Sequence, residues 1–166
     1  PVRMGVLPLL VPENFAAGLG SKDNYALELT RQFRNEILKS GEISIVELFD
    51  FGSWPGRRED FYTGNYQALQ AARIAGYDLL FVGQMQAIAN DKDLEIMTKV
   101  IDVVNGVTLW HGKTIVTSYA REDRRLLSSF EIVKDSPEMF SFPQRQAELV
   151  RCTINDGAIR KPEADL

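Results

Sequence analysis

The order of apolar and polar residues along the first half of the chain predicts alternating strands and helices. An apolar run at residues 2–11 stops at a proline and has the length of a buried strand. Apolar residues then recur four apart from residue 25 to residue 37, which predicts an amphipathic helix that ends before Gly41. Residues 43–49 form a second strand-like run. Residues 66–75 form a shorter helical segment that ends at Gly76.

The second half of the chain is richer in strand signals. Residues 77–87 are almost uniformly apolar around positions 79–82, which is typical of a central strand covered on both faces. Two β-branched runs follow, at residues 94–104 and 107–118. The charged segment 122–132 is predicted to be partly helical, and a last helix is predicted over residues 142–152.

The two β-branched runs flank Asn105-Gly106, a dipeptide typical of tight hairpin turns because both residues tolerate a positive φ at little cost. A two-residue turn at this dipeptide would place Ile101 opposite Trp110. Asp102 stands close to the turn, where its carboxylate can accept hydrogen bonds from the turn backbone or from a neighbouring arginine. We therefore interpret Asp102, Asn105 and Gly106 as structural turn residues.

The predicted element order is β-α-β-α-β-β-β-α. Early βαβ units favour parallel neighbours, whereas the late hairpin is antiparallel, so we expect an α/β fold (α+β mixed) with helices packed on a mixed sheet of about five strands. The chain shows no internal repeat and no linker. We expect one domain over residues 1–155 and a polar tail over residues 156–166.

The composition narrows the function classes. The 166 residues carry a formal net charge of −4, with 45% hydrophobic and 25% charged residues. An acidic chain whose basic residues are scattered argues against nucleic-acid binding or an anionic membrane surface as the general role. The single cysteine, Cys152, excludes a disulfide within the chain but does not decide the compartment. No apolar run approaches the length of a membrane-spanning helix.

No pattern in the sequence predicts catalysis, a cofactor or a metal. His111 is the only histidine and has no ligand partners at zinc-site spacing. Cys152 lies late in a predicted amphipathic helix, where a buried thiol is inert. The loop from Gly18 to Lys22 superficially resembles a phosphate-binding loop but lacks its spacing, so we interpret it as a connection between a strand and a helix.

An aromatic and arginine-rich segment at residues 49–66 is the candidate partner-binding surface. Aromatic residues together with arginines in a loop are typical of protein–protein contacts. The alternative is that several of these side chains fold back over a sheet edge. The candidate contact residues are Trp54, Arg57, Arg58, Phe61, Tyr62 and Tyr66.

Two motifs carry a resemblance to a known group of proteins. The first, A-x-x-x-G-Y-D-x-L-x-V-G, runs from Ala72 to Gly83, and the second includes the Leu109-Trp110-His111-Gly112 block after the hairpin turn. The chain resembles the bacterial envelope group that includes the curli-secretion lipoprotein CsgG, penicillin-binding-protein activator lipoproteins and TolB amino-terminal-like domains. The resemblance spans roughly residues 2–118 in element order.

This resemblance implies a non-enzymatic periplasmic protein that assists assembly or secretion of an envelope structure through protein contacts. It further implies an outer-membrane lipid anchor, envelope-protein partners and homo-oligomerisation. We expect any targeting segment to precede Pro1. The alternative is a domain, either a binding module or an enzyme, that binds a small molecule or nucleotide through the carboxyl ends of its strands and the loop from Gly18 to Lys22.

Overall fold

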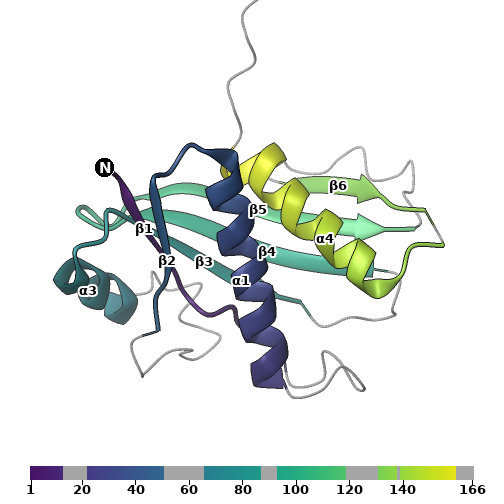
Figure 1. Cartoon of the computed structure of the whole chain (residues 1–166), viewed down its shortest axis with the longest axis horizontal. Coiled ribbons are helices and arrows are strands. Elements are labelled where there is room, and N and C mark those ends of the chain that lie inside the picture. The colour runs from purple at the N-terminus through teal and green to yellow at the C-terminus, as the bar shows by residue number, and fades with distance from the viewer. Residues whose placement is uncertain (13–21, 51–65, 87–92, 119–130, 138, 160–166) are drawn as a thin grey trace, which may run out of the picture.

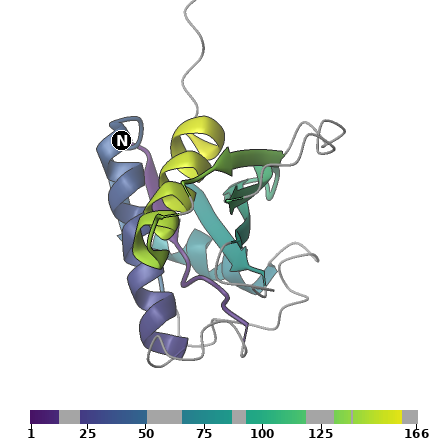
Figure 2. The same cartoon turned by 90° about the vertical axis from the view of Figure 1, so that its right-hand side faces the viewer.

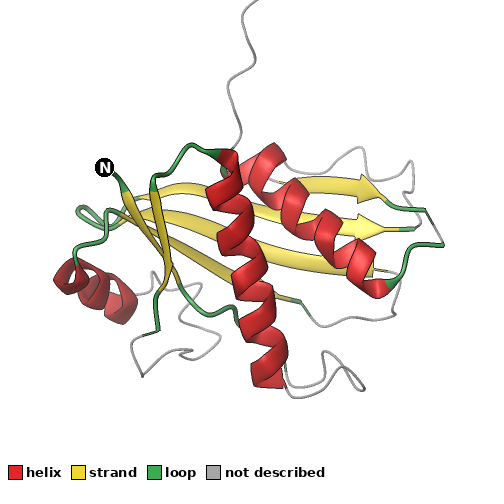
Figure 3. Cartoon of the chain, in the orientation of Figure 1, coloured by secondary structure: helices red, strands yellow, loops and turns green. Residues whose placement is uncertain are grey.

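The fold is a six-stranded mixed sheet with helices on both faces (Figures 1 and 3). The computed structural model describes residues 1–12, 22–50, 66–86, 93–118, 131–137 and 139–159. The strands are β1 (Arg3–Val6), β2 (Ile45–Leu48), β3 (Leu79–Met85), β4 (Asp93–Asp102), β5 (Thr108–Thr117) and β6 (Glu131–Asp135). The helices are α1 (Lys22–Ser40), α3 (Tyr66–Ala75), α4 (Phe142–Thr153) and the short π-helical turn η2 (Ile154–Ala158).

The strand order is β2-β1-β3-β4-β5-β6. Strand β1 lies between β2 and β3 and is parallel to both, whereas β3, β4 and β5 are antiparallel neighbours. Strand β6 is parallel to β5. The single domain and the mixed α/β sheet predicted from the sequence are therefore confirmed.

Strand β6 is the element that the sequence pattern missed. The segment 122–132 was predicted to be partly helical, but its last two residues, 131 and 132, lie in β6, and the rest of the segment lies outside the described residues. The strand has only two apolar residues, Ile132 and Val133, between charged ends. A strand this short and charged shows no alternating pattern, and it forms because β5 offers a partner.

The two faces of the sheet carry separate parts of the core. Helices α1 and α4 cover one face, as Figure 2 shows, where Phe33 of α1 packs against Phe81 of β3 with ring centroids 5.3 Å apart. Helix α3 covers part of the other face, where Leu69 packs with Leu80 and Val82. Consecutive residues of β3 thus serve opposite layers, which explains its uniformly apolar sequence.

Specific signals define the helix ends. Helix α1 ends at Ser40 and α3 at Ala75, and the following Gly41 and Gly76 have φ of 76° and 81°. Both glycines were predicted to end these helices, and the left-handed backbone confirms this. Helix α4 begins with a capping box, in which Ser141 and Gln144 exchange side-chain hydrogen bonds with each other's backbone N–H groups.

The hairpin register differs from the prediction. Ile101 pairs with Thr108 and Val100 with Trp110, and a bulge between these pairs leaves Leu109 without a cross-strand partner. The chain turns earlier than expected because the Asp102 backbone N–H already donates to the Val107 carbonyl, at 2.8 Å. A longer turn, with Gly106 at its end, replaces the predicted two-residue turn.

The packed chain extends past the predicted start of the polar tail at residue 156. The turn η2 continues α4 directly, and both Ala158 and Ile159 pack against the larger core. Within η2, Gly157 lies against the indole of Trp110, so this segment covers the outer part of β5.

Candidate interaction surface

The predicted partner-binding residues fall mainly outside the described residues. This applies to Trp54, Arg57, Arg58, Phe61 and Tyr62, as it does to Gly18 in the other candidate loop. Tyr66 is the first residue of α3. The contact role of this aromatic segment therefore stays a prediction.

The turn between β4 and β5 is held by its own side chains. The Asp102 carboxylate accepts from the backbone N–H groups of Val104 at 2.9 Å and Asn105 at 3.2 Å. The Asn105 side-chain oxygen accepts from the Val107 N–H at 3.0 Å, and Gly106 adopts a φ of 74°. The backbone N–H groups of Val104, Asn105 and Val107 thus each donate to a side-chain oxygen within the turn, which fixes the turn conformation.

Helix α3 and the start of β3 hold this turn from the side. The Arg73 guanidinium donates from Nε to the Val103 carbonyl at 2.8 Å. The Val103 N–H donates to the Asp78 carbonyl at 2.9 Å. The last turn of α3, the start of β3 and the hairpin turn therefore form one connected end of the molecule (Figure 1).

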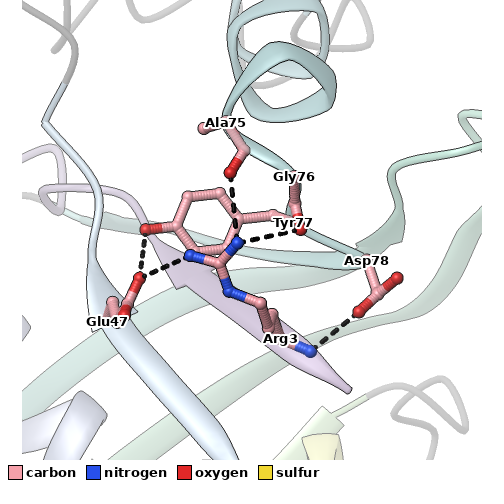
Figure 4. A network of polar contacts seen from close by, with 6 residues as sticks. All are labelled: Arg3, Glu47, Ala75, Gly76, Tyr77 and Asp78. Atoms are coloured by element: carbon pink, nitrogen blue, oxygen red, sulfur yellow. Dashed lines mark hydrogen bonds and ion pairs between the residues drawn. The ribbon is translucent and has the colours of Figure 1, made fainter. Parts of the chain in front are cut away.

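Arg3 joins the start of β1 to the same end of the molecule (Figure 4). Its backbone N–H donates to the Asp78 carboxylate at 2.8 Å, and its guanidinium donates to the Ala75 and Gly76 carbonyls at 3.2 and 3.3 Å. These two carbonyls lie at the C-terminus of α3, where a cation is favoured by the helix dipole. The arginine therefore acts as a cap supplied from a distant part of the sequence.

The Arg3 guanidinium also binds Glu47 of β2 at 3.1 Å and lies over the ring of Tyr77, 4.9 Å from its centroid. The Tyr77 hydroxyl donates to the same Glu47 oxygen at 2.8 Å. The hydrogen bonds from Tyr77 and Arg3 lower the pKa of Glu47 below its ordinary value. Burial, followed by the bond to Glu47, raises the pKa of Tyr77 to about 12.

Four aliphatic side chains stand exposed at this end of the molecule, and we call them the apolar tip. Ile74 is 82% exposed, Val104 76%, Leu109 57% and Val107 52%. Val104 and Val107 belong to the turn, Leu109 is the bulge residue, and Ile74 follows Arg73 on α3. The stretch from residue 103 to residue 110 contains no charged residue. These exposed aliphatic side chains lie on and beside a turn that hydrogen bonds hold in place, and they are accessible to a partner.

The sequence indicated part of this surface, because Asp102 was expected to accept hydrogen bonds from the turn backbone and does so. An aspartate three residues before an Asn-Gly dipeptide is typical of a turn in which the aspartate carboxylate accepts hydrogen bonds from the backbone N–H groups that follow it. The contribution of Arg3 has no local signal, because residues 3, 47 and 77 come together only through the sheet order β2-β1-β3.

The potential nucleophile and the only histidine lie on opposite faces of the sheet. Cys152 is buried on the α4 side, and burial raises its pKa to about 11. His111 pairs with Lys99 across the hairpin, on the face of the sheet that α3 covers in part. Burial and the neighbouring Lys99 charge lower the pKa of His111. These two residues therefore cannot form a thiol–imidazole pair.

Within the described ranges, no three histidine, cysteine, aspartate or glutamate side chains come together as a metal-binding group. No helix in that part of the chain is both long enough and apolar enough to cross a bilayer.

Comparisons with known proteins give matches among solved structures. No protein-family model matches the sequence, and no curated protein matches it either. PelC from Paraburkholderia phytofirmans, solved as a dodecamer, aligns with 12% identity over 92% of this chain and 84% of the PelC chain, with a TM-score of 0.54. The lipoprotein GNA1162 from Neisseria meningitidis aligns with 14% identity over 74% of this chain and 86% of that chain, with a TM-score of 0.46.

TolB from Acinetobacter baumannii aligns with 15% identity over 68% of this chain and 23% of the TolB chain, with a TM-score of 0.36. The chain therefore resembles PelC in structure over nearly its whole length. At 12% identity, the likeness to PelC establishes a shared fold.

Proposed function

We propose that this chain is a non-enzymatic component of a bacterial cell envelope that assists assembly or secretion through protein–protein contacts. The observation that carries the proposal is the apolar tip. Four aliphatic side chains are exposed by more than half: Val104 and Val107 lie on a turn held by the Asp102 and Asn105 side chains, and Leu109 and Ile74 lie on the neighbouring β5 and α3. A rigid surface loses little conformational entropy when it binds a partner, so even a small apolar area contributes to affinity.

The fold likeness to PelC over nearly the whole chain supports self-association as part of the proposal, since PelC was solved as a dodecamer. The envelope compartment is proposed from the resemblance of the sequence motifs to envelope lipoproteins. We propose a periplasmic location with an outer-membrane lipid anchor added outside this chain. The aromatic segment that includes Trp54 and Arg57 is proposed as a second contact surface.

The proposal is tested by fractionating cells that carry the full-length gene product with a C-terminal tag, followed by cross-linking and capture of its partners. We expect the protein in the envelope fraction. Replacing Val104 and Leu109 by Ser should weaken capture of the partner several-fold while the thermal midpoint stays nearly unchanged, because both side chains face solvent. Recovery of the protein only in the cytoplasm would overturn the proposal.

A second double variant tests the aromatic segment separately from the apolar tip. Replacing Trp54 and Arg57 by Ala should weaken capture without loss of stability if this segment contacts the partner. A loss of stability equal to that of a core substitution would instead show that these side chains cover the sheet.

A further inference from the structure

The two outer strands of the sheet run in the same direction. Strands β2, β1 and β3 are mutually parallel. Strand β4 is antiparallel to both β3 and β5, so β5 runs in the same direction as β3. Strand β6 is parallel to β5. Strand β6 is therefore parallel to β2 at the opposite edge of the sheet. Among the described strands, each of these two has a neighbour on one side only.

Each outer strand directs a set of backbone groups away from its neighbour. In a parallel pair, alternate residues direct both their N–H and C=O toward the same neighbouring strand. Phe49 donates to the Val6 carbonyl of β1, so Val46 and Leu48 direct their groups outward. Ser136 donates to the Thr117 carbonyl of β5, so Glu131 and Val133 direct theirs outward.

We propose that a second copy of this chain binds by adding its β2 to β6 of the first copy, as parallel strands with Glu47 opposite Val133. In this arrangement the Val133 N–H donates to the Val46 carbonyl of the second copy. The Leu48 N–H of the second copy donates to the Val133 carbonyl. The inference rests on the self-association in the proposed function and gives it a surface, an orientation and a register.

The distribution of charge on the two strands selects this register. The side chains must keep to their own face of the sheet, so the register can shift only by two residues at a time. A shift in one direction places Glu47 opposite Asp135, and a shift in the other places it opposite Glu131. Both alternatives bring carboxylates face to face, which is unfavourable. With Glu47 opposite Val133, no pair of like charges is opposed.

The same charges disfavour a two-fold dimer through β6 that is centred on Val133, the residue that the proposed pairing uses. A two-fold axis at Val133 would pair the strands in antiparallel fashion and place Glu131 opposite Asp135 of the second copy. Addition of β6 to β2 keeps every copy in the same orientation. The contact is therefore heterologous, and it leads to a closed ring or to an open filament.

Removing one outward donor tests the proposed pairing. Proline at position 133 deletes the outward N–H but leaves the N–H groups of residues 132 and 134, which face β5, in place. We expect the wild-type chain to form oligomers by multi-angle light scattering, and the Val133→Pro variant to lose them. The Val133→Thr variant, which keeps the N–H and a β-branched side chain, should retain them, and circular dichroism should show that both variants are folded.

Cysteine cross-linking tests the register and the orientation. Leu48 and Lys134 would lie opposite each other between copies, so the double variant Leu48→Cys, Lys134→Cys in a Cys152→Ala background should yield covalent dimers, trimers and larger species with a short bis-maleimide. Each single variant should stay uncross-linked. Covalent dimers from Lys134→Cys alone would show a two-fold contact and overturn the inference.

Oligomers that survive Val133→Pro, or a wild-type chain that is monomeric, would also overturn the inference. A monomer that still fractionates with the envelope and captures a partner would leave the envelope role standing. Failure of the inference can therefore be told apart from failure of the proposed function.

Discussion

The indole of Trp110 occupies the space in which a side chain at Gly112 would lie. The two residues are on the same face of β5, and a Cβ atom at position 112 would meet the ring atoms of Trp110. On its other side, the ring lies so close to Gly157 that a Cβ there would approach Trp110 Cζ2 to 2.7 Å. The Leu109-Trp110-His111-Gly112 block is therefore a packing motif that joins η2 to the sheet.

We expect Gly112→Ala to lower the free energy of unfolding by about 1–3 kcal/mol, because a methyl group would displace the indole from a packed position. Urea denaturation followed by tryptophan fluorescence, in a Trp54→Phe background that leaves Trp110 as the only tryptophan, measures both the stability and the environment of the ring. The matched control is Gly41→Ala, where no atom lies within 4 Å of the added methyl group and the cost arises from the positive φ alone. An unchanged tryptophan spectrum for Gly112→Ala would contradict this packing.

The Asp102 carboxylate should contribute measurably to stability. Replacing Asp102 by Ala removes the acceptor for two backbone N–H groups, and we expect a loss of about 1–2 kcal/mol. Asp102→Asn keeps an acceptor oxygen and should recover most of this loss. Amide hydrogen exchange should report faster exchange at Val104 and Asn105 in the Ala variant. Equal losses for Ala and Asn would show that charge, and not the hydrogen bonds, stabilises the turn.

The bonds of Glu47 to Arg3 and Tyr77 should make stability depend on acidic pH. Because folding lowers the pKa of Glu47, its contribution is complete above the ordinary value of 4.5 and is lost as the pH falls through the folded-state pKa. The thermal midpoint of Glu47→Gln should therefore lie below that of the wild-type chain at pH 7. The difference between the two thermal midpoints should become smaller as the pH falls below 4.5.

Glu28→Gln supplies the control for the loss of one negative charge and one exposed ion pair, since Glu28 binds Arg31 on α1 at 3.0 Å. If the difference in thermal midpoint between Glu47→Gln and the wild-type chain stays constant from pH 7 to well below pH 4.5, Glu47 acts through packing and not through its charge.

The sequence pattern predicted those elements whose signals are local. Helix α3 follows from apolar spacing and Gly76, and β3 follows from a continuous apolar run. Strand β6 could not be predicted in this way, because its stability depends on pairing with β5 rather than on its own composition. The hairpin register was missed because the predicted two-residue turn takes its position from Asn105-Gly106, whereas the Asp102 backbone N–H already donates to the Val107 carbonyl.

The candidate surface depends even more on tertiary structure. Leu109 is exposed because of a bulge that no dipeptide signal marks. Arg3, Glu47 and Tyr77 are separated by 44 and 30 residues along the chain and meet only once β1 lies between β2 and β3. Sequence reasoning could thus place the turn, but it could not show which side chains the fold leaves exposed around it.

The thiol of Cys152 should be nearly unreactive in the folded protein. It is buried, and burial raises its pKa from 9.0 to about 11, which by itself lowers the thiolate fraction at pH 8 about 100-fold. Alkylation by iodoacetamide should therefore be slow in buffer and should rise to the rate of a free thiol in urea. Lys134→Cys in a Cys152→Ala background provides an exposed thiol as the control. Equal alkylation rates for the two folded proteins would contradict the burial of Cys152. If the Cys152 rate is slow and increases with urea concentration, the rate reports how often the contact between α4 and the sheet opens.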